Sequence, residues 1–196
     1  MKSPITAFTF LLAGFISALT GCGASAESRF YALSSTATAA GASSASATKV
    51  LVGPVSIPAT VDRPEMVVQV PPNGVEVEEF NRWAAPLGDM ISRTVATDLG
   101  GQLASSEITS QPLANFNPTY KVTISVQRFD SVKGQEAILE AVWTVQSTST
   151  GKSQSGSTVT HESTQGDSFE AIAAAHSRAV ARLSSDIAVV IRSESN

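Results

Sequence analysis

Two adjoining segments of the sequence alternate between apolar and polar residues, and this alternation constrains the fold more than any other feature. The segments span residues 120–129 and 137–146. Because successive side chains of a β-strand point to opposite faces, each segment is predicted to be a strand with one face in the core. The apolar residues that share these faces are Tyr120, Val122, Ile124, Val126, Leu139, Ala141, Trp143 and Val145.

Further runs are also predicted to be strands. Residues 49–58 and 65–70 are rich in β-branched residues, and a Pro-Pro-Asn-Gly turn after the second run predicts a hairpin with residues 75–80. Residues 155–164 are polar and alternating, as expected of an edge strand. A short aromatic and apolar patch at residues 29–35 fits a first strand.

Two helices are predicted from apolar residues that recur every three or four positions. Pro86 stands at the first turn of the first helix, where a missing N–H costs nothing, and Ser168 is the predicted N-cap of the second. The two stripes are Leu87, Ile91, Val95, Leu99 and Leu103, then Phe169, Ala173, His176, Val180, Leu183, Ile187 and Val190. These elements predict an α+β fold, a two-layer sandwich with a mostly antiparallel sheet and two main helices on one face.

The N-terminal segment has the pattern of a secretory signal peptide, residues 1–21. Lys2 precedes an uncharged apolar run, residues 4–21, which contains too many small and polar residues to favour a retained membrane-spanning helix. Removal of this segment lowers the formal net charge from −4 to −5. A negative chain without a clustered basic face argues against a nucleic-acid partner and against electrostatic adhesion to anionic lipid.

The last residues of this run, Leu19-Thr20-Gly21-Cys22, resemble the bacterial lipobox. The resemblance implies cleavage before Cys22 and acylation of that residue. One acyl chain anchors a protein only reversibly, whereas two or more hold it firmly. The competing interpretation of the single cysteine is a small buried hydrophobe. Because Gly23 rather than Asp follows the cysteine, the resemblance further implies the periplasmic face of the outer membrane.

Residues 34–48 contain only Ser, Thr, Ala and Gly. This composition predicts a flexible tether with a mean span of roughly 20 Å. We therefore expect an acylated N-terminus with a short strand and a tether over residues 22–48, followed by a single α+β domain over residues 49–194. If residues 29–35 are a first strand, the tether becomes a loop within the domain.

No catalytic pattern is complete in the sequence. Gly151-Lys152-Ser153 lacks the upstream glycine of a phosphate-binding loop, and the zinc-protease pattern that begins at His161 lacks its second histidine. His161 is predicted to be a solvated strand residue, and His176 a packed, hydrogen-bonded one. We expect no enzyme activity, no catalytic residue, no metal site and no cofactor.

Two stretches, residues 52–70 and 81–99, resemble the ABC-type transport auxiliary lipoprotein family, which includes the lipoprotein of the Pqi (paraquat-inducible) system. Asp62-Arg63-Pro64 and Arg82-Trp83-Ala84 carry the resemblance best, together with Pro86-Leu87. Family members often have Glu where this chain has Ala85. A charge contact made there by relatives would be absent here.

The resemblance implies an accessory or docking subunit of an MCE-type envelope lipid transport system. The implied partner is an MCE-domain protein of the inner membrane, with Asp62, Arg63 and Trp83 as candidate contacts; a homo-oligomer stays open. For the same residues, an ordinary loop and core packing are the competing interpretations. Two other functions also stay open: a periplasmic lipid-carrying protein, and a structural lipoprotein of an unrelated envelope assembly.

Overall fold

The computed structural model describes residues 26–36, 48–105, 107–111 and 114–195. Cys22 and the middle of the predicted tether, residues 37–47, lie outside this described part. The elements are β1 (Arg29–Tyr31), β2 (Val50–Ser56), β3 (Glu65–Val70), β4 (Gly74–Trp83), α2 (Leu87–Leu103), β5 (Ile108–Thr109), β6 (Tyr120–Val132), β7 (Glu136–Ser147), β8 (Ser153–Ser163) and α3 (Phe169–Ser195).

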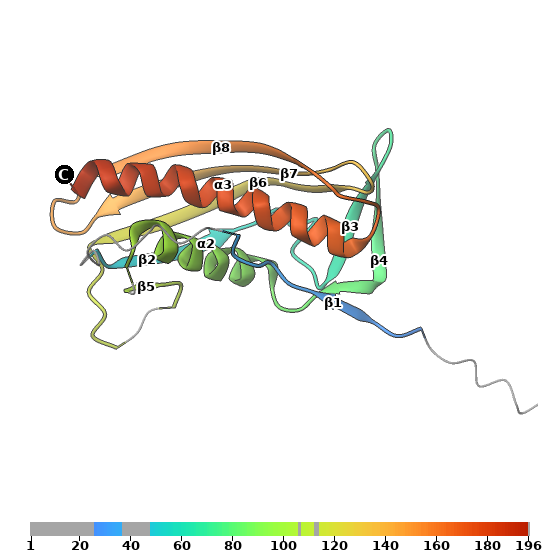
Figure 1. Ribbon diagram of the computed structural model, residues 1–196, viewed down its shortest axis with the longest axis horizontal. Helices are drawn as coiled ribbons and strands as arrows, with labels where there is room; N and C mark the ends of the chain where they lie inside the picture. The colour runs from blue at the N-terminus through green and yellow to red at the C-terminus, as the bar shows by residue number, and fades with distance from the viewer. Residues whose placement is uncertain (1–25, 37–47, 106, 112–113, 196) are drawn as a thin grey trace, which may run out of the picture.

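A five-stranded sheet with the order β5-β2-β6-β7-β8 forms one layer, and α2 and α3 form the other (Figure 1). The helices pack on the sheet because their apolar stripes face the buried side of the strands. The α+β two-layer prediction is confirmed, but the sheet is mixed. β2 pairs in parallel with β5 and β6, because the chain crosses over through β3, β4 and α2 before it returns to the sheet.

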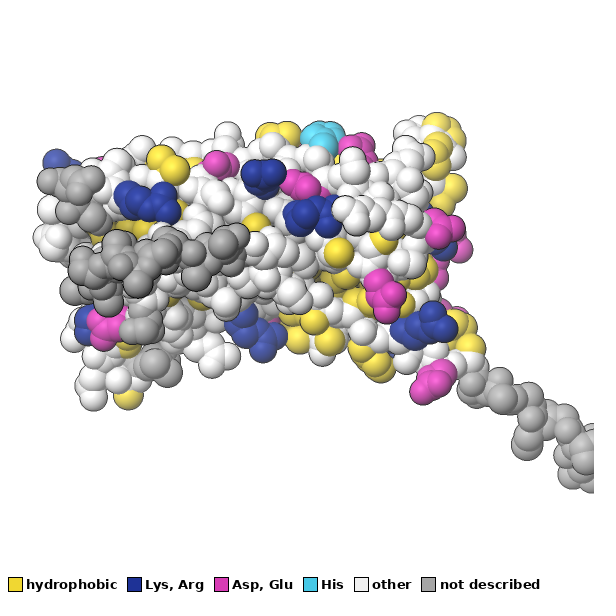
Figure 2. All heavy atoms as spheres, in the orientation of Figure 1, with side chains coloured by type: hydrophobic (Ala, Val, Ile, Leu, Met, Phe, Trp, Pro, Cys, Tyr) yellow, Lys and Arg dark blue, Asp and Glu magenta, His cyan; other side chains and the backbone are white. Residues whose placement is uncertain are grey.

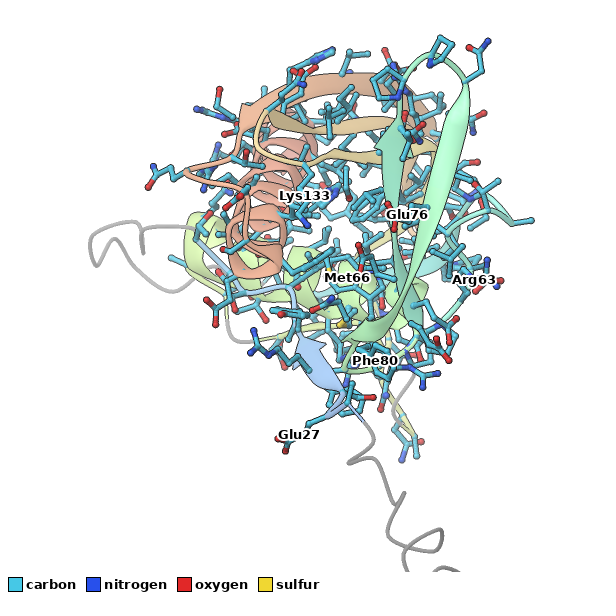
Figure 3. All side chains as sticks on the ribbon, turned by 90° about the vertical axis from the view of Figure 1, so that its right-hand side faces the viewer. Glu27, Arg63, Met66, Glu76, Phe80 and Lys133 are labelled. Carbon is cyan, nitrogen blue, oxygen red and sulfur yellow. The ribbon has the colours of Figure 1, made fainter. Side chains whose placement is uncertain are left out.

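A second sheet, with the order β1-β4-β3, stands at one end of the molecule (Figure 1). β3 and β4 form the predicted antiparallel hairpin, whereas β1 pairs in parallel with β4. We call this three-stranded unit the small sheet. Its hairpin projects beyond the body of the protein (Figure 3 faces this end).

The core contains the residues that the alternation predicts. All eight apolar residues named for the paired strands β6 and β7 are buried, and so are the two predicted helix stripes. A β-bulge between Val126 and Arg128 then shifts the alternation in β6 by one residue. As a result Phe129 and Ser131 also face the core.

The segment from Arg29 to Thr36 packs on the domain and is not a free linker. Leu33 is 9% exposed, and the backbone N–H of Ser34 donates a hydrogen bond to Ser177 Oγ at 3.1 Å. The hydroxyl of Ser35 donates to the carboxylate of Asp98. These contacts agree with the alternative in which residues 29–35 form a first strand of the domain, and the domain boundary expected at residue 49 stays a prediction.

Candidate docking site

Asp62 and Arg63 lie on an exposed turn between β2 and β3. The backbone N–H of Asp62 donates to the carbonyl of Pro58 at 3.1 Å, which closes the turn. Arg63 Nε lies 3.4 Å from Glu65 Oε2, and the Arg63 side chain is 44% exposed. Both residues are therefore accessible to a partner, as the sequence predicts for a contact residue or an ordinary loop.

The two sequence stretches that carry the resemblance come together across β3 and β4. The N–H of Trp83 donates to the carbonyl of Pro64 at 2.7 Å. Beside it, Arg82 Nη2 lies 2.7 Å from Glu65 Oε1, so Glu65 is shared by Arg82 and Arg63. Partly exposed ion pairs of this kind contribute little stability, and the cluster leaves cationic groups at the surface.

Trp83 is a core residue, in agreement with core packing, the competing interpretation of this side chain. Its side chain is 5% exposed and offers a partner almost no surface. The ring packs edge-on against Phe129, with centroids 6.1 Å apart, and against His176 at 6.2 Å. The physical reason is its place at the end of β4, where the small sheet meets the core under α3.

His176 is packed and hydrogen-bonded, as predicted. Its ring stacks on Phe129 with a centroid distance of 3.8 Å, and Nε2 lies 2.9 Å from Ser131 Oγ. Burial lowers the pKa of His176 from 6.5 to about 3, because the charged imidazolium would lose its hydration. Its Nδ1 has no hydrogen-bond partner among the described residues. This histidine is therefore neutral at pH 7 and serves the core.

His161 is exposed on β8 and lies 3.0 Å from Glu136 on β7, in agreement with the solvated strand residue that the sequence predicts. Within the described ranges, no group of three or more His, Cys, Asp or Glu side chains comes together as a metal site. The two histidines are on different elements with different partners. The two histidines therefore do not form a shared site.

Exposed apolar side chains are concentrated on the small sheet. Of the eight large hydrophobic residues that are exposed in the described part of the chain, five belong to this sheet. Figure 2 shows hydrophobic side chains gathered near β1, beside acidic and basic ones. Apolar surface of this kind often marks an interaction site. The five residues are Phe30, Val70, Val75, Val77 and Phe80, and we call them the small-sheet patch. By the strand register, Val70 lies on the opposite face of the hairpin from Val75 and Val77.

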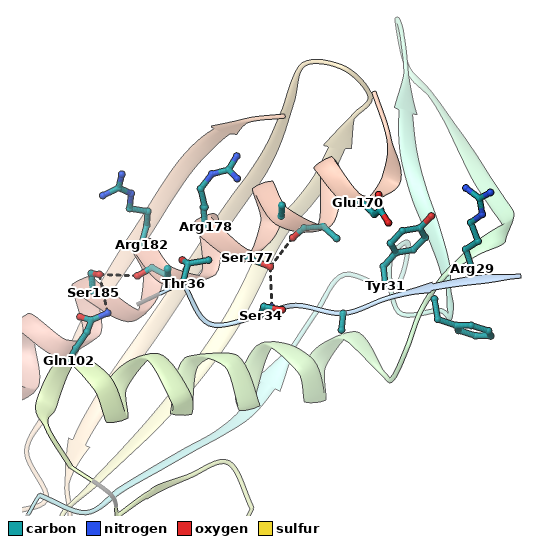
Figure 4. Close-up of a pocket in the computed structure, with 15 residues that line it drawn as sticks. Arg29, Tyr31, Ser34, Thr36, Gln102, Glu170, Ser177, Arg178, Arg182 and Ser185 are labelled. Carbon is teal, nitrogen blue, oxygen red and sulfur yellow. Dashed lines mark hydrogen bonds between the residues drawn. The ribbon is translucent and has the colours of Figure 1, made fainter. Parts of the chain in front are cut away.

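A groove of about 1180 Å³ lies between the extended segment 29–36 and α3 (Figure 4). Small side chains of α3 line one wall, and Arg178 and Arg182 flank it. Glu162 of β8 accepts from both arginines, at 3.1 and 3.4 Å. We call this feature the β1–α3 groove. The sequence analysis missed it, because the only signal was the alanine-rich character of the last helix.

Comparison with known proteins assigns the chain to a family. A model described as "ABC-type transport auxiliary lipoprotein component" matches residues 31–188. The protein belongs to the ABC-type transport auxiliary lipoprotein family. The match covers all elements from the end of β1 into α3. The family resemblance seen in the sequence is thereby confirmed, and the chain is an auxiliary lipoprotein of a transport system.

Solved structures share the fold of this auxiliary lipoprotein. One is the crystal structure of an uncharacterized protein, with a TM-score of 0.70 and 18% identity over 85% of this chain and 99% of that one. A second is a protein of Xanthomonas campestris from family DUF330, with a TM-score of 0.68 and 20% identity over 82% of this chain and 93% of that one. No curated protein matches the sequence. Neither of the described helices is long and apolar enough to span a membrane.

Proposed function

We propose that this auxiliary lipoprotein is anchored through acylated Cys22 to the periplasmic face of the outer membrane. There it docks an MCE-domain protein of an envelope lipid transport system. The observation that carries the proposal is the match to the family of transport auxiliary lipoproteins over residues 31–188. An auxiliary component of a transporter acts by holding other components in place, and a lipid anchor raises its local concentration at the membrane.

Two surface features support docking. The small-sheet patch exposes apolar side chains that gain stability when a partner covers them. Next to it, Arg63 and Arg82 share Glu65, and Glu76 and Glu79 are exposed on β4, so charges of both signs stand beside the patch and can orient a partner. Such charges chiefly raise the association rate and select the partner, while the apolar residues supply most of the affinity.

A pull-down with the mature lipoprotein in detergent tests the docking function. The bait is the lipoprotein, and the prey is the purified MCE-domain protein encoded by a neighbouring gene. We expect a complex with micromolar or tighter affinity, and Val75→Ser together with Val77→Ser should weaken it at least about tenfold. Val159→Ser, at an exposed valine on β8 outside the small sheet, is the control and should change the affinity less than about twofold.

The alternative functions give different results in the same preparation. A periplasmic lipid carrier would bind phospholipid stoichiometrically, and native mass spectrometry would detect that lipid. A structural lipoprotein of another assembly would bind neither the MCE-domain protein nor lipid. Failure of the wild-type protein to form the complex at micromolar concentrations would rule out the docking function.

Lipidation at Cys22 is tested separately. The mature chain should begin at Cys22 and carry acyl mass, because Leu19-Thr20-Gly21 precedes the cysteine at the end of a signal. Cys22→Ser should accumulate as an unprocessed precursor without lipid. Intact-mass spectrometry of membrane extracts measures both forms, and a mature chain with another N-terminus and no acyl mass would disprove the anchor.

A further inference from the structure

The β1–α3 groove has a sheet edge as one of its walls. β1 is the terminal strand of the small sheet, and β4 is its only strand partner among the described residues. An exposed edge of this kind can accept a further strand, since its backbone N–H and C=O groups have no ladder partners. Several peptide-binding domains bind an extended segment in this way, along a strand edge.

The direction of the backbone groups shows which residues would pair. The carbonyl of Tyr31 accepts from the N–H of Ala84 at 2.8 Å, so the backbone groups of Tyr31 face β4. Because successive residues of a strand direct their backbone groups to opposite edges, those of Phe30 and Ala32 point away from β4. The next residue in this alternation, Ser34, donates its N–H to Ser177 of α3. The edge therefore faces the groove at Phe30 and Ala32, and α3 occupies it at Ser34.

The α3 wall leaves room for a bound chain because its side chains are small. Ala173, Ser177, Ala181 and Ser185 recur every four residues along this wall, and Ala174 stands beside the first of them. The groove volume of about 1180 Å³ exceeds the roughly 300–1,000 Å³ of typical small-molecule pockets. The length of the wall, four turns of helix, suits an extended segment better than a compact ligand.

The charge of the lining identifies the class of segment. Arg29, Arg178 and Arg182 line the groove, whereas Glu170 is the single acidic lining residue. Glu162 pairs with both Arg178 and Arg182 and offsets part of this charge, and the excess stays positive in a chain whose formal net charge is −4. An acidic segment is the complementary occupant. Serines and arginines in the lining make the groove a poor site for acyl chains.

We propose that the β1–α3 groove binds an extended acidic segment of the partner protein, which adds as a strand to the free edge of β1. This inference rests on the docking function proposed above and names the contact through which part of that docking occurs. The residue pair at the centre of the contact is Phe30 and Ala32, through their backbone groups. Arg182, whose side chain is 73% exposed, interacts with a carboxylate of the segment.

A blocking substitution on α3 tests the groove. Ala174 is exposed on the groove wall, so Ala174→Trp fills the space without entering the core. Val189→Trp is the matched control, since Val189 is exposed on the same helix outside the lining. Binding of each full-length mature variant to the purified MCE-domain protein is measured by calorimetry. We expect Ala174→Trp to weaken binding at least about tenfold and Val189→Trp less than about twofold.

Two further measurements address the mode of binding. Hydrogen exchange of the wild-type complex should show protection of the Phe30 and Ala32 amides. Arg182→Glu should weaken binding and reduce its salt dependence, whereas Arg93→Glu on the exposed face of α2 should leave both unchanged.

Each alternative outcome is distinct. If Ala174→Trp binds like Val189→Trp, or if the two amides stay unprotected, the inference fails while the docking function stands. Loss of a bound phospholipid in Ala174→Trp would assign the groove to lipid, and a changed oligomeric state would assign it to a second copy of the chain. If the wild-type protein forms no complex, the docking function fails and the inference fails with it.

Discussion

At the residue scale, His176 shows how a polar side chain can belong to the core. It lies on the apolar stripe of α3, between Phe129 and Trp83, and Ser131 is its hydrogen-bond partner. The sequence predicted a packed histidine from its position in the stripe. It could not predict the partner, because the bulge in β6 brings Ser131 to the core face, and that side would otherwise be exposed.

The buried His176 makes the stability of the protein depend on pH. The pKa of His176 is about 3 in the folded protein and about 6.5 in the unfolded chain. Between these values the unfolded chain binds more protons, so the free energy of unfolding decreases as the pH falls below 6.5. The expected loss at pH 4.5 is roughly 3 kcal/mol. Denaturant titrations at pH 7 and pH 4.5 measure it.

Substitution of each of the two histidines provides the control for this pH dependence. His176→Gln removes the titrating group, so this variant should lose about 3 kcal/mol less than the wild type between the two pH values. His161→Gln, on the exposed surface of β8, should behave like the wild type. Equal pH dependence in all three proteins would show that His176 is not the titrating group.

At the element scale, the segment of residues 29–36 is attached to the two helices by a buried carboxylate. Asp98 of α2 is fully buried and accepts from Ser35 of the segment and from Ser184 of α3, the latter at 3.0 Å. It thereby joins three parts of the chain that are far apart in sequence. Its place beside Leu99 in the helical pattern gave no sign of this, because a one-sequence pattern does not reveal partners 63 and 86 residues away.

We predict that Asp98→Ala lowers the free energy of unfolding by about 2–3 kcal/mol, because it removes the charged acceptor that Ser35 and the buried Ser184 share. Amide exchange of residues 29–36 should accelerate as the segment detaches. Asp89→Ala, an exposed aspartate in the first turn of the same helix, should cost less than about 1 kcal/mol. If the two variants unfold alike, the carboxylate does not hold the segment.

Prediction from sequence was strongest for elements with a clear period. The hairpin of β3 and β4, the paired strands β6 and β7, and both helices follow their patterns closely. The parallel pairings of β1 with β4 and of β2 with β6 were missed. Periodicity identifies a strand and its buried face, whereas the neighbour of a strand depends on long-range contacts. The groove was missed for the same reason, since its walls are 143 residues apart where Ser34 meets Ser177.

At the scale of the whole molecule, the two sheets share one hydrophobic core. The same cluster of buried residues contains Met66 and Trp83 of the small sheet and Trp143 of the large sheet. Because the sheets have no separate cores among the described residues, we predict that they unfold in one cooperative transition.

Single-tryptophan variants test this cooperativity. Trp143→Phe leaves Trp83 to report on the small sheet, and Trp83→Phe leaves Trp143 to report on the large one. Within each variant, the fluorescence midpoint should match the midpoint from circular dichroism. A small sheet that unfolds at lower denaturant concentration than the rest would contradict the single core.

The parallel pairing of β1 with β4 also determines how the protein bears mechanical load. Six residues lie between Cys22 and Arg29, so the proposed acyl anchor at Cys22 reaches at most about 25 Å from the strand. Tension on this anchor pulls β1 along its own axis. The hydrogen bonds between β1 and β4 are then loaded in shear, together rather than one after another. Behind the strand, the bond between Ser35 and Asp98 passes the force to α2 and α3. With the proposed anchor and partner in place, this pairing lets the protein bear tension between them while the core is undisturbed.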